Sequence, residues 1–154
     1  GEGESQMINR NKYQLLVCKK MLDTNGMVRG CFLDDDYYAV SVDGFTCVIV
    51  DAKNAVFDIS KIRTSVTLKE VCARSKDDVE VYPTDEMRNP EHGRYLLKLA
   101  SKDGKMHAWI ANAIYKEFSG YRYYAHDPRS RVLIEDGCGV PVGVMMPTRV
   151  KEDK

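Results

Sequence analysis

Two groups of side chains in the sequence have the types needed for metal binding or catalysis. The three aspartates at 34–36, with Asp43 nearby, could supply the carboxylate oxygens that magnesium and calcium prefer. Their spacing differs from that of a calcium-binding loop, and an acidic turn beside a hairpin explains them. His126 precedes Asp127, which could suggest a general base, but neighbouring side chains on an extended chain point to opposite sides. We therefore expect neither a metal site nor a catalytic site in these segments.

The cysteines have no pattern typical of a zinc site or a disulfide framework. They are Cys18, Cys31, Cys47, Cys72 and Cys138. No two of them have C-x-x-C spacing, and the three histidines are not arranged around them. We interpret them as reduced core residues of a cytoplasmic protein.

Two further segments could be read as ligand-binding motifs. The glycine-rich stretch at 137–143 joins two expected strands and opens no helix, so it cannot form a dinucleotide cradle. The aromatic stretch at 121–126 could stack on single-stranded nucleic acid if its rings faced outward together. Strand alternation separates Tyr121 and Tyr123 from Tyr124, which favours packing for part of this stretch. The sequence thus predicts no enzyme and no cofactor.

The length and composition fit one globular domain, or two tightly fused subdomains. A chain of 154 residues is long enough for a real core, and 44% hydrophobic with 30% charged residues is an ordinary balance. Lys plus Arg equals Asp plus Glu at 23 each, so net charge gives no argument for nucleic-acid or membrane binding, although a local basic face remains possible. The apolar runs are shorter than the ~20 residues needed to cross a bilayer. We expect residues 1–6 to be a disordered terminus, without the features of a signal peptide, and 151–154 to be a charged tail.

Hydrophobic periodicity predicts two helices. The first covers residues 7–22 and is ended by Gly26, and the second covers 104–118 and is ended by Ser119 and Gly120. Both have an apolar stripe at the 3.6-residue period, with charged residues on the other side.

The rest of the chain is predicted to be mainly extended. Residues 37–42 and 45–50 should form a hairpin around Asp43-Gly44. Residues 55–101 should also be mainly extended, including 55–59 and 65–71, with 84–93 as an exposed loop between subdomains of about 7–88 and 93–150. Three strands should follow the second helix, at 121–126, 131–136 and 140–148. This order predicts an α+β fold with a mostly antiparallel sheet and a weak internal duplication.

From about Lys105 to Val150 the chain resembles the end of the bacterial DNA polymerase III β subunit, the DNA sliding clamp. The resemblance depends on the segments RVLIED at 131–136 and VGVMMPTRV at 142–150, following a helix and a strand. Met146, Pro147 and Arg149 occupy the positions of a Met-Pro-x-Arg-aliphatic signature. The resemblance implies one clamp-like domain over 7–150, with two helices packed on antiparallel sheets.

The resemblance also implies a DNA-contacting face. In clamps the helices line a ring and present basic side chains to the DNA backbone without reading its sequence. The matching residues here are Arg10, Lys12, Lys19, Lys20, Lys105, His107 and Lys116. The alternative is an ordinary solvated helix face.

A peptide pocket is the second implied site. In clamps the C-terminal strand helps to form an apolar pocket that captures short peptides from partner proteins. The matching residues here are Val144, Met146, Pro147, Thr148 and Arg149. Methionine suits such a pocket because it repacks around varied ligands, whereas the alternative is that these residues are edge-strand core.

The favoured hypothesis is therefore a non-enzymatic, sliding-clamp-like protein with protein partners and possible contacts to double-stranded DNA. A bacterial clamp protomer has several such domains and this chain has room for one, so encircling DNA would require a homo-oligomer of several copies. The alternative is a binding or regulatory module that uses the clamp fold without a DNA role. A small enzyme is the third hypothesis, because fold does not fix function.

Overall fold

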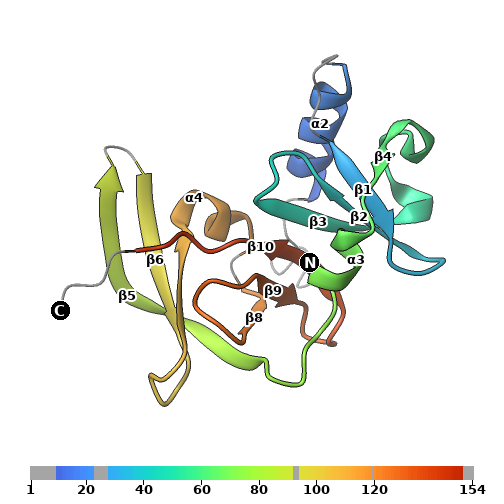
Figure 1. Ribbon diagram of the computed structural model, residues 1–154. Coiled ribbons are helices and arrows are strands. Elements are labelled where there is room, and N and C mark those ends of the chain that lie inside the picture. Colours follow the sequence, from blue (N-terminus) through green and yellow to red (C-terminus); the bar gives the residue numbers. More distant parts are fainter. Residues whose placement is uncertain (1–9, 23–27, 92–93, 119, 151–154) are drawn as a thin grey trace.

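The computed structural model describes residues 10–22, 28–91, 94–118 and 120–150. The expected disordered terminus, the charged tail and the helix-ending Gly26 lie outside these residues. Ten strands form one sheet in the order β4-β1-β2-β3-β10-β9-β8-β5-β6-β7 (Figure 1). Every pair of neighbours is antiparallel except β1 and β4. The prediction of an α+β fold with a mostly antiparallel sheet is confirmed.

The strands are β1 (Arg29–Phe32), β2 (Tyr37–Ser41), β3 (Thr46–Asp51), β4 (Arg63–Thr64), β5 (Val79–Glu91), β6 (Arg94–Ala100), β7 (His107–Ala111), β8 (Arg122–Ala125), β9 (Val132–Glu135) and β10 (Pro141–Met145). The α-helices are α2 (Arg10–Met21), α3 (Thr67–Val71) and α4 (Asn112–Tyr115). The 3-10 helices are η1 (Ala52–Asn54), η2 (Ile59–Lys61) and η3 (Lys116–Phe118).

The first part of the chain follows the sequence prediction. Helix α2 packs Val17 into the core, and the Gln14 side-chain oxygen accepts a hydrogen bond from the Val56 amide at 2.7 Å. The hairpin of β2 and β3 turns at Asp43. Its carboxylate accepts hydrogen bonds from the backbone amides of Phe45 and Thr46, each at 2.8 Å. Gly44 has a φ of 78°, a conformation that favours glycine. The helix and the hairpin are both confirmed.

The predicted helix over 104–118 is wrong in its first half. Residues 107–111 form β7, which pairs with β6 from Ala100↔His107 to Leu96↔Ala111. Only α4 and η3 that follow are helical. Ala108, Trp109 and Ile110 are buried in succession, because both faces of β7 are covered. A short apolar run of this kind has no period that separates a strand from a buried helix.

Three other segments differ from the predictions. The expected loop at 84–93 is largely strand, because β5 continues to Glu91 with irregular register against β6. Figure 1 shows these two strands extending as an arm. Residues 84–91 are mostly polar and have no apolar–polar alternation, so the sequence pattern did not indicate a strand. The expected extended segment at 65–71 contains α3, which packs Leu68 and Val71 against the sheet and so overrides their strand propensity. Residues 55–59 form no strand.

The two faces of the sheet carry different helices. Along β3, Val48 and Val50 belong to one core cluster, whereas Cys47 and Ile49 belong to the other, as expected from strand alternation. Helices α2 and α4, with η3, pack on the first cluster, and α3 packs on the second. The two predicted helices therefore lie on the same face of the sheet, opposite α3.

The sheet order relates the two parts of the chain. Helix α2 is followed by β1, β2 and β3, and α4 is followed by β8, β9 and β10. The last strands of these two units pair with each other, with Val144 opposite Cys47. In the order β1-β2-β3-β10-β9-β8, each unit therefore runs from its first strand at the outside to its last strand at the junction. At this junction a Cβ on Gly143 would lie 2.7 Å from the Phe118 ring and 2.9 Å from the Cys47 carbonyl oxygen, so only glycine allows this approach.

The cysteines are free, and not all of them are in the core. Cys31, Cys47 and Cys72 are buried, and the Sγ atoms of Cys47 and Cys72 lie 4.0 Å apart. Cys18 is half-buried. Cys138 is exposed in the turn between β9 and β10, where its amide donates to the Asp136 carboxylate, so the core assignment was wrong for this residue.

Candidate functional site

The segment at 146–150 that follows β10 is anchored at two points. The Met146 amide donates to the Phe45 carbonyl at 2.8 Å, and the Thr148 amide donates to the Trp109 carbonyl at 2.8 Å. The segment therefore runs from the β2–β3 turn to β7. Between these bonds lies Pro147, which has no amide hydrogen to satisfy. The signature residues are held in a defined path at the surface.

A hollow lies on either side of this C-terminal segment. The first has a volume of about 640 Å³ and lies between Met146, the end of α3 and the β8–β9 turn. The second has a volume of about 280 Å³ and is lined by Trp109, Pro128, Thr148 and Arg149, with His107 and Val150. Arg129 lines both hollows. Together they form a surface that could receive an extended ligand crossing the segment.

The expected peptide-binding residues are placed differently from one another. Met146 is 38% exposed and lines the first hollow, whereas Thr148 and Arg149 line the second. Pro147 is half-buried between them. Val144 is 3% exposed and packs in the core cluster under α3, which is the alternative that the sequence left open for it.

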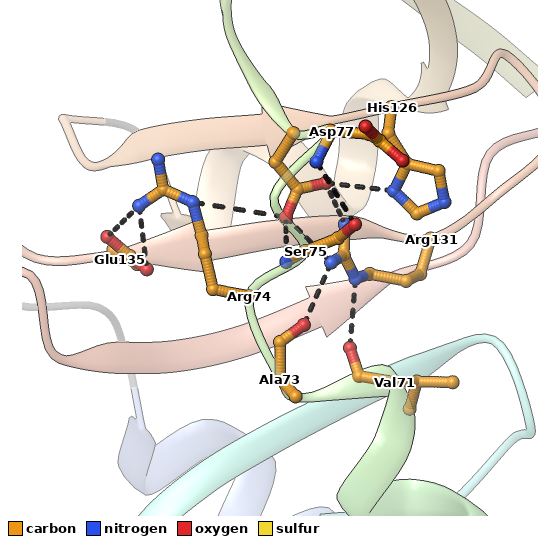
Figure 2. Close-up of polar contacts among 9 residues, drawn as sticks. Val71, Ala73, Arg74, Ser75, Asp77, His126, Arg131 and Glu135 are labelled. Carbon is orange, nitrogen blue, oxygen red and sulfur yellow. Dashed lines mark hydrogen bonds and ion pairs between the residues drawn. The ribbon is translucent and has the colours of Figure 1, made fainter.

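A buried polar cluster connects elements that line the first hollow; Figure 2 shows its polar contacts. The Asp78 side chain is fully buried and accepts hydrogen bonds from Arg131 at 2.8 and 2.9 Å, from the Ser75 amide at 2.7 Å and from His126 Nδ1 at 2.9 Å. Burial alone would raise the pKa of Asp78, but these hydrogen bonds outweigh burial and lower the pKa to about 2. Asp78 is therefore ionised at neutral pH, and His126 Nδ1 donates to it.

Arg131 connects this carboxylate to α3. Its side chain is 6% exposed. Nε donates to the Val71 carbonyl at 3.0 Å and Nη2 donates to the Ala73 carbonyl at 2.9 Å, which satisfies carbonyls at the end of the helix. Arg74 extends the cluster, because it pairs with Glu135 at 3.3 Å and lies 3.6 Å over the Tyr124 ring. The cluster thus holds α3, the start of β5 and the β8–β9 turn in fixed relation.

The cluster contains a His–Asp pair that the sequence did not reveal. His126 bonds to Asp78, which lies 48 positions earlier, and not to Asp127, whose carboxylate accepts from the Arg129 amide at 2.7 Å. Nothing in the local pattern could have indicated a partner so distant in the chain. Asp78 is shared with Arg131, and no hydroxyl or thiol bonds to His126 in the described part of the chain. His126 and Arg131 together hold the Asp78 carboxylate in place.

The aspartates considered for metal binding stabilise turns. The Asp34 carboxylate accepts from the amides of Asp36 and Tyr37, at 2.8 and 2.9 Å, and Asp43 stabilises the hairpin turn. Within residues 10–22, 28–91, 94–118 and 120–150, no group of three His, Cys, Asp or Glu residues is placed to hold a metal ion.

The expected DNA-contacting residues separate into two locations. Lys19 and Lys20 on α2 and Lys116 in η3 are exposed on helices that pack on the same face of the sheet. Lys105 is exposed in the β6–β7 turn, and His107 begins β7, so neither lies on a helix as predicted. Arg10 and Lys12 fall in α2, but their side chains are outside the part that the structure describes.

The described helices include none long and apolar enough to span a bilayer. Comparison with known proteins identified no relative: no protein-family model, no curated protein and no solved structure matches this chain. The interpretation of the site therefore depends on the geometry of its residues.

Proposed function

We propose that this protein is a non-enzymatic, sliding-clamp-like binding protein whose C-terminal segment captures a short peptide of a partner protein. The observation that carries the proposal is the placement of Met146 and Arg149 in two adjoining hollows, on a segment anchored by backbone hydrogen bonds from the Met146 and Thr148 amides. A rigid, exposed segment beside preformed hollows loses little conformational freedom on binding.

The architecture supports the clamp-like interpretation. Two units of a helix and three antiparallel strands join through their closing strands, β3 and β10. Both helices pack on one face of the sheet. This matches the internal duplication and the pair of helices that the resemblance implies, with β7 in place of the first half of the second helix.

The side chains around the two hollows indicate which peptide would fit. The first hollow offers apolar surface from Met146 and Val71 together with Arg74. The second offers Arg149 beside Pro128, because Trp109, which also lines it, is only 4% exposed. A peptide with an apolar anchor beside Met146 and a carboxylate directed at Arg149 would satisfy both, because arginine pairs bidentately with carboxylates.

A selection from a random heptapeptide display library tests this proposal, with affinities measured by fluorescence anisotropy. Selected peptides should combine apolar and acidic residues, and Met146→Ala and Arg149→Ala should each weaken binding about tenfold or more. Met87→Ala is the matched control, since Met87 is 47% exposed on the β5–β6 arm. Failure to select any peptide, or equal affinity for the Met146→Ala and Met87→Ala variants, would reject the proposal.

Sequence-independent DNA contact is the second candidate function. It is favoured by the exposure of Lys19, Lys20 and Lys116 on two helices that share one face of the sheet. Duplex binding should weaken steeply with salt and with substitution of these lysines by glutamine. A ring would also require an oligomer, which light scattering can detect. A monomer that ignores duplex DNA would remove this candidate and leave a peptide-binding module without a DNA role.

A further inference from the structure

Two of the free cysteines contact each other in the interior of the protein. Cys47 belongs to β3 and Cys72 directly follows α3, and their Sγ atoms lie 4.0 Å apart. Each residue is 4% exposed, and the two are 25 positions apart in the chain. Two thiols in contact can form a disulfide, which is chemistry that neither the peptide site nor the basic face uses.

The fold brings the two thiols together through the packing of α3. Strand alternation directs Cys47 and Ile49 toward the face of the sheet that α3 covers. The Cys72 amide donates to the Leu68 carbonyl at 3.1 Å, so Cys72 completes the last turn of α3. Its side chain packs in the same core cluster as Cys47. The contact between the two sulfurs therefore depends on how α3 sits on the sheet.

The two partners are held with different firmness. Strand β3 pairs with β2 on one side and with β10 on the other, which fixes the backbone at Cys47. Helix α3 has five residues, and Val66 at its N-cap has no side-chain acceptor to cap it. A disulfide joins its sulfurs at about 2.05 Å, so the two Sγ atoms must approach by about 2 Å. Rotation of the two side chains with a small shift of α3 supplies this approach.

We propose that Cys47 and Cys72 form a reversible disulfide that ties α3 to β3, with a small disulfide such as oxidised glutathione as the oxidant. The Cys72 thiolate first attacks one glutathione sulfur, which forms a mixed disulfide and releases one glutathione thiolate. Cys47 then attacks the Cys72 sulfur and releases the second glutathione. The two protein thiols lose two electrons and two protons, and the small disulfide takes up both and becomes two thiols.

Cys72 is the thiol that reacts first. The hydrogen bond with Cys72 and burial raise the pKa of the Cys47 thiol, so Cys47 keeps its proton while α3 is in place. Because both thiols are buried, the oxidant reaches Cys72 when α3 opens locally. This opening breaks the bonds from Arg131 to the carbonyls at the end of α3. Oxidation of the pair is therefore slower than reaction of Cys138, which is exposed.

The disulfide acts beneath one wall of the first hollow. The end of α3, including Val71 and Arg74, lines this hollow. Cys47 is the register partner of Val144 in β10, the strand that leads into the C-terminal segment. Oxidation therefore fixes α3 to the pair of strands that carries this segment. Formation of the bond does not depend on peptide capture, so the two proposals can fail independently.

Cross-link mapping by mass spectrometry tests the bond. Folded wild-type protein is incubated with oxidised glutathione, blocked with N-ethylmaleimide and digested, and a peptide linked through Cys47 and Cys72 should accumulate. Reduction with dithiothreitol should remove this link. Cys72→Ala should lose it, whereas Cys31→Ala is the matched control and should keep it. Cys31 is also buried, and its register partner Ala39 belongs to the same core cluster.

The stability of the oxidised protein shows whether the bond locks α3 in place. A disulfide that closes this loop removes freedom from the unfolded chain, so oxidised wild type should melt about 5 °C or more above reduced wild type. Amide hydrogen exchange in α3 should slow about tenfold. Cys31→Ala should show both changes and Cys72→Ala neither. In the reduced protein, N-ethylmaleimide should label Cys138 at least about tenfold faster than Cys72.

Three results would overturn the inference. The first is the absence of a link between Cys47 and Cys72 in folded wild type although Cys138 has reacted. The second is a link that forms only in denaturing urea, which would mean that the thiols meet only in the unfolded chain. The third is an oxidised form that melts no higher than the reduced form. Wild-type protein supplies all three measurements, so they remain decisive if Cys72→Ala does not fold.

Discussion

Replacing Arg131 by methionine tests the buried polar cluster most severely. The substitution keeps an apolar stem but removes both bonds to Asp78 and the donors to the Val71 and Ala73 carbonyls. Asp78 would remain fully buried with hydrogen bonds from His126 and the Ser75 amide and a longer ion pair to Arg74 at 3.9 Å. Breaking a buried ion pair on one side costs about 3–5 kcal/mol, so the free energy of unfolding at pH 7 should fall by that amount.

The acid titration of Asp78 gives an independent measure of how much its ionised carboxylate stabilises the folded protein. Its pKa is lowered from 3.8 to about 2 in the folded protein, which corresponds to about 2 kcal/mol of stability at neutral pH. Because the folded pKa is the lower one, this stabilisation is complete above pH 3.8 and is lost as the pH falls toward 2. Asp78→Asn cannot titrate, so its stability should fall less than that of wild type across this window.

Urea unfolding at pH 7 and at several values down to pH 2 measures both effects. Lys98→Met is the matched control, because Lys98 pairs with Glu86 at 3.2 Å and both side chains have solvent access, at 26% and 56% exposed, where an ion pair contributes about 1 kcal/mol or less. The reasoning would be refuted if Arg131→Met cost no more than Lys98→Met, or if wild type and Asp78→Asn lost stability in parallel below pH 4.

Two further substitutions test the packing of the fold. Gly143→Ala should destabilise the protein by about 1–3 kcal/mol through overpacking against Phe118. Gly137→Ala should be neutral, because nothing lies within 4 Å of its added Cβ. Equal midpoints of the two variants in thermal unfolding would contradict the packing at the junction of β3 and β10. Gln14→Ala should lower the free energy of unfolding by about 1–2 kcal/mol, because the Val56 amide loses its acceptor. An unchanged midpoint in urea unfolding would contradict this contact between α2 and the segment at Val56.

Local signals predicted a substantial part of the fold. The hairpin at Asp43-Gly44, the helix before it and the last three strands each depend on patterns within a few residues, and all are present. Strand β7 was missed because its buried run at 108–110 has no helical or alternating period that distinguishes the two structures. Helix α3 was missed because packing of Leu68 and Val71 outweighed local propensity.

The candidate site was predicted only where it is contiguous in sequence. Met146 and Arg149 could be named because they lie in one short signature. Trp109 was assigned to a helix, so its carbonyl bond to the Thr148 amide could not be anticipated. The pairing of Asp78 with Arg131 spans 53 positions, and no single-sequence pattern encodes a contact at that separation.

The most direct test of peptide capture is a map of backbone amide chemical shifts on addition of a library-selected heptapeptide. The proposed site predicts that the largest changes fall at Met146, Thr148 and Arg149 and at Arg129, which lines both hollows. Changes concentrated on the β5–β6 arm or at the edge formed by β4 and β1, with the C-terminal segment unaffected, would contradict it.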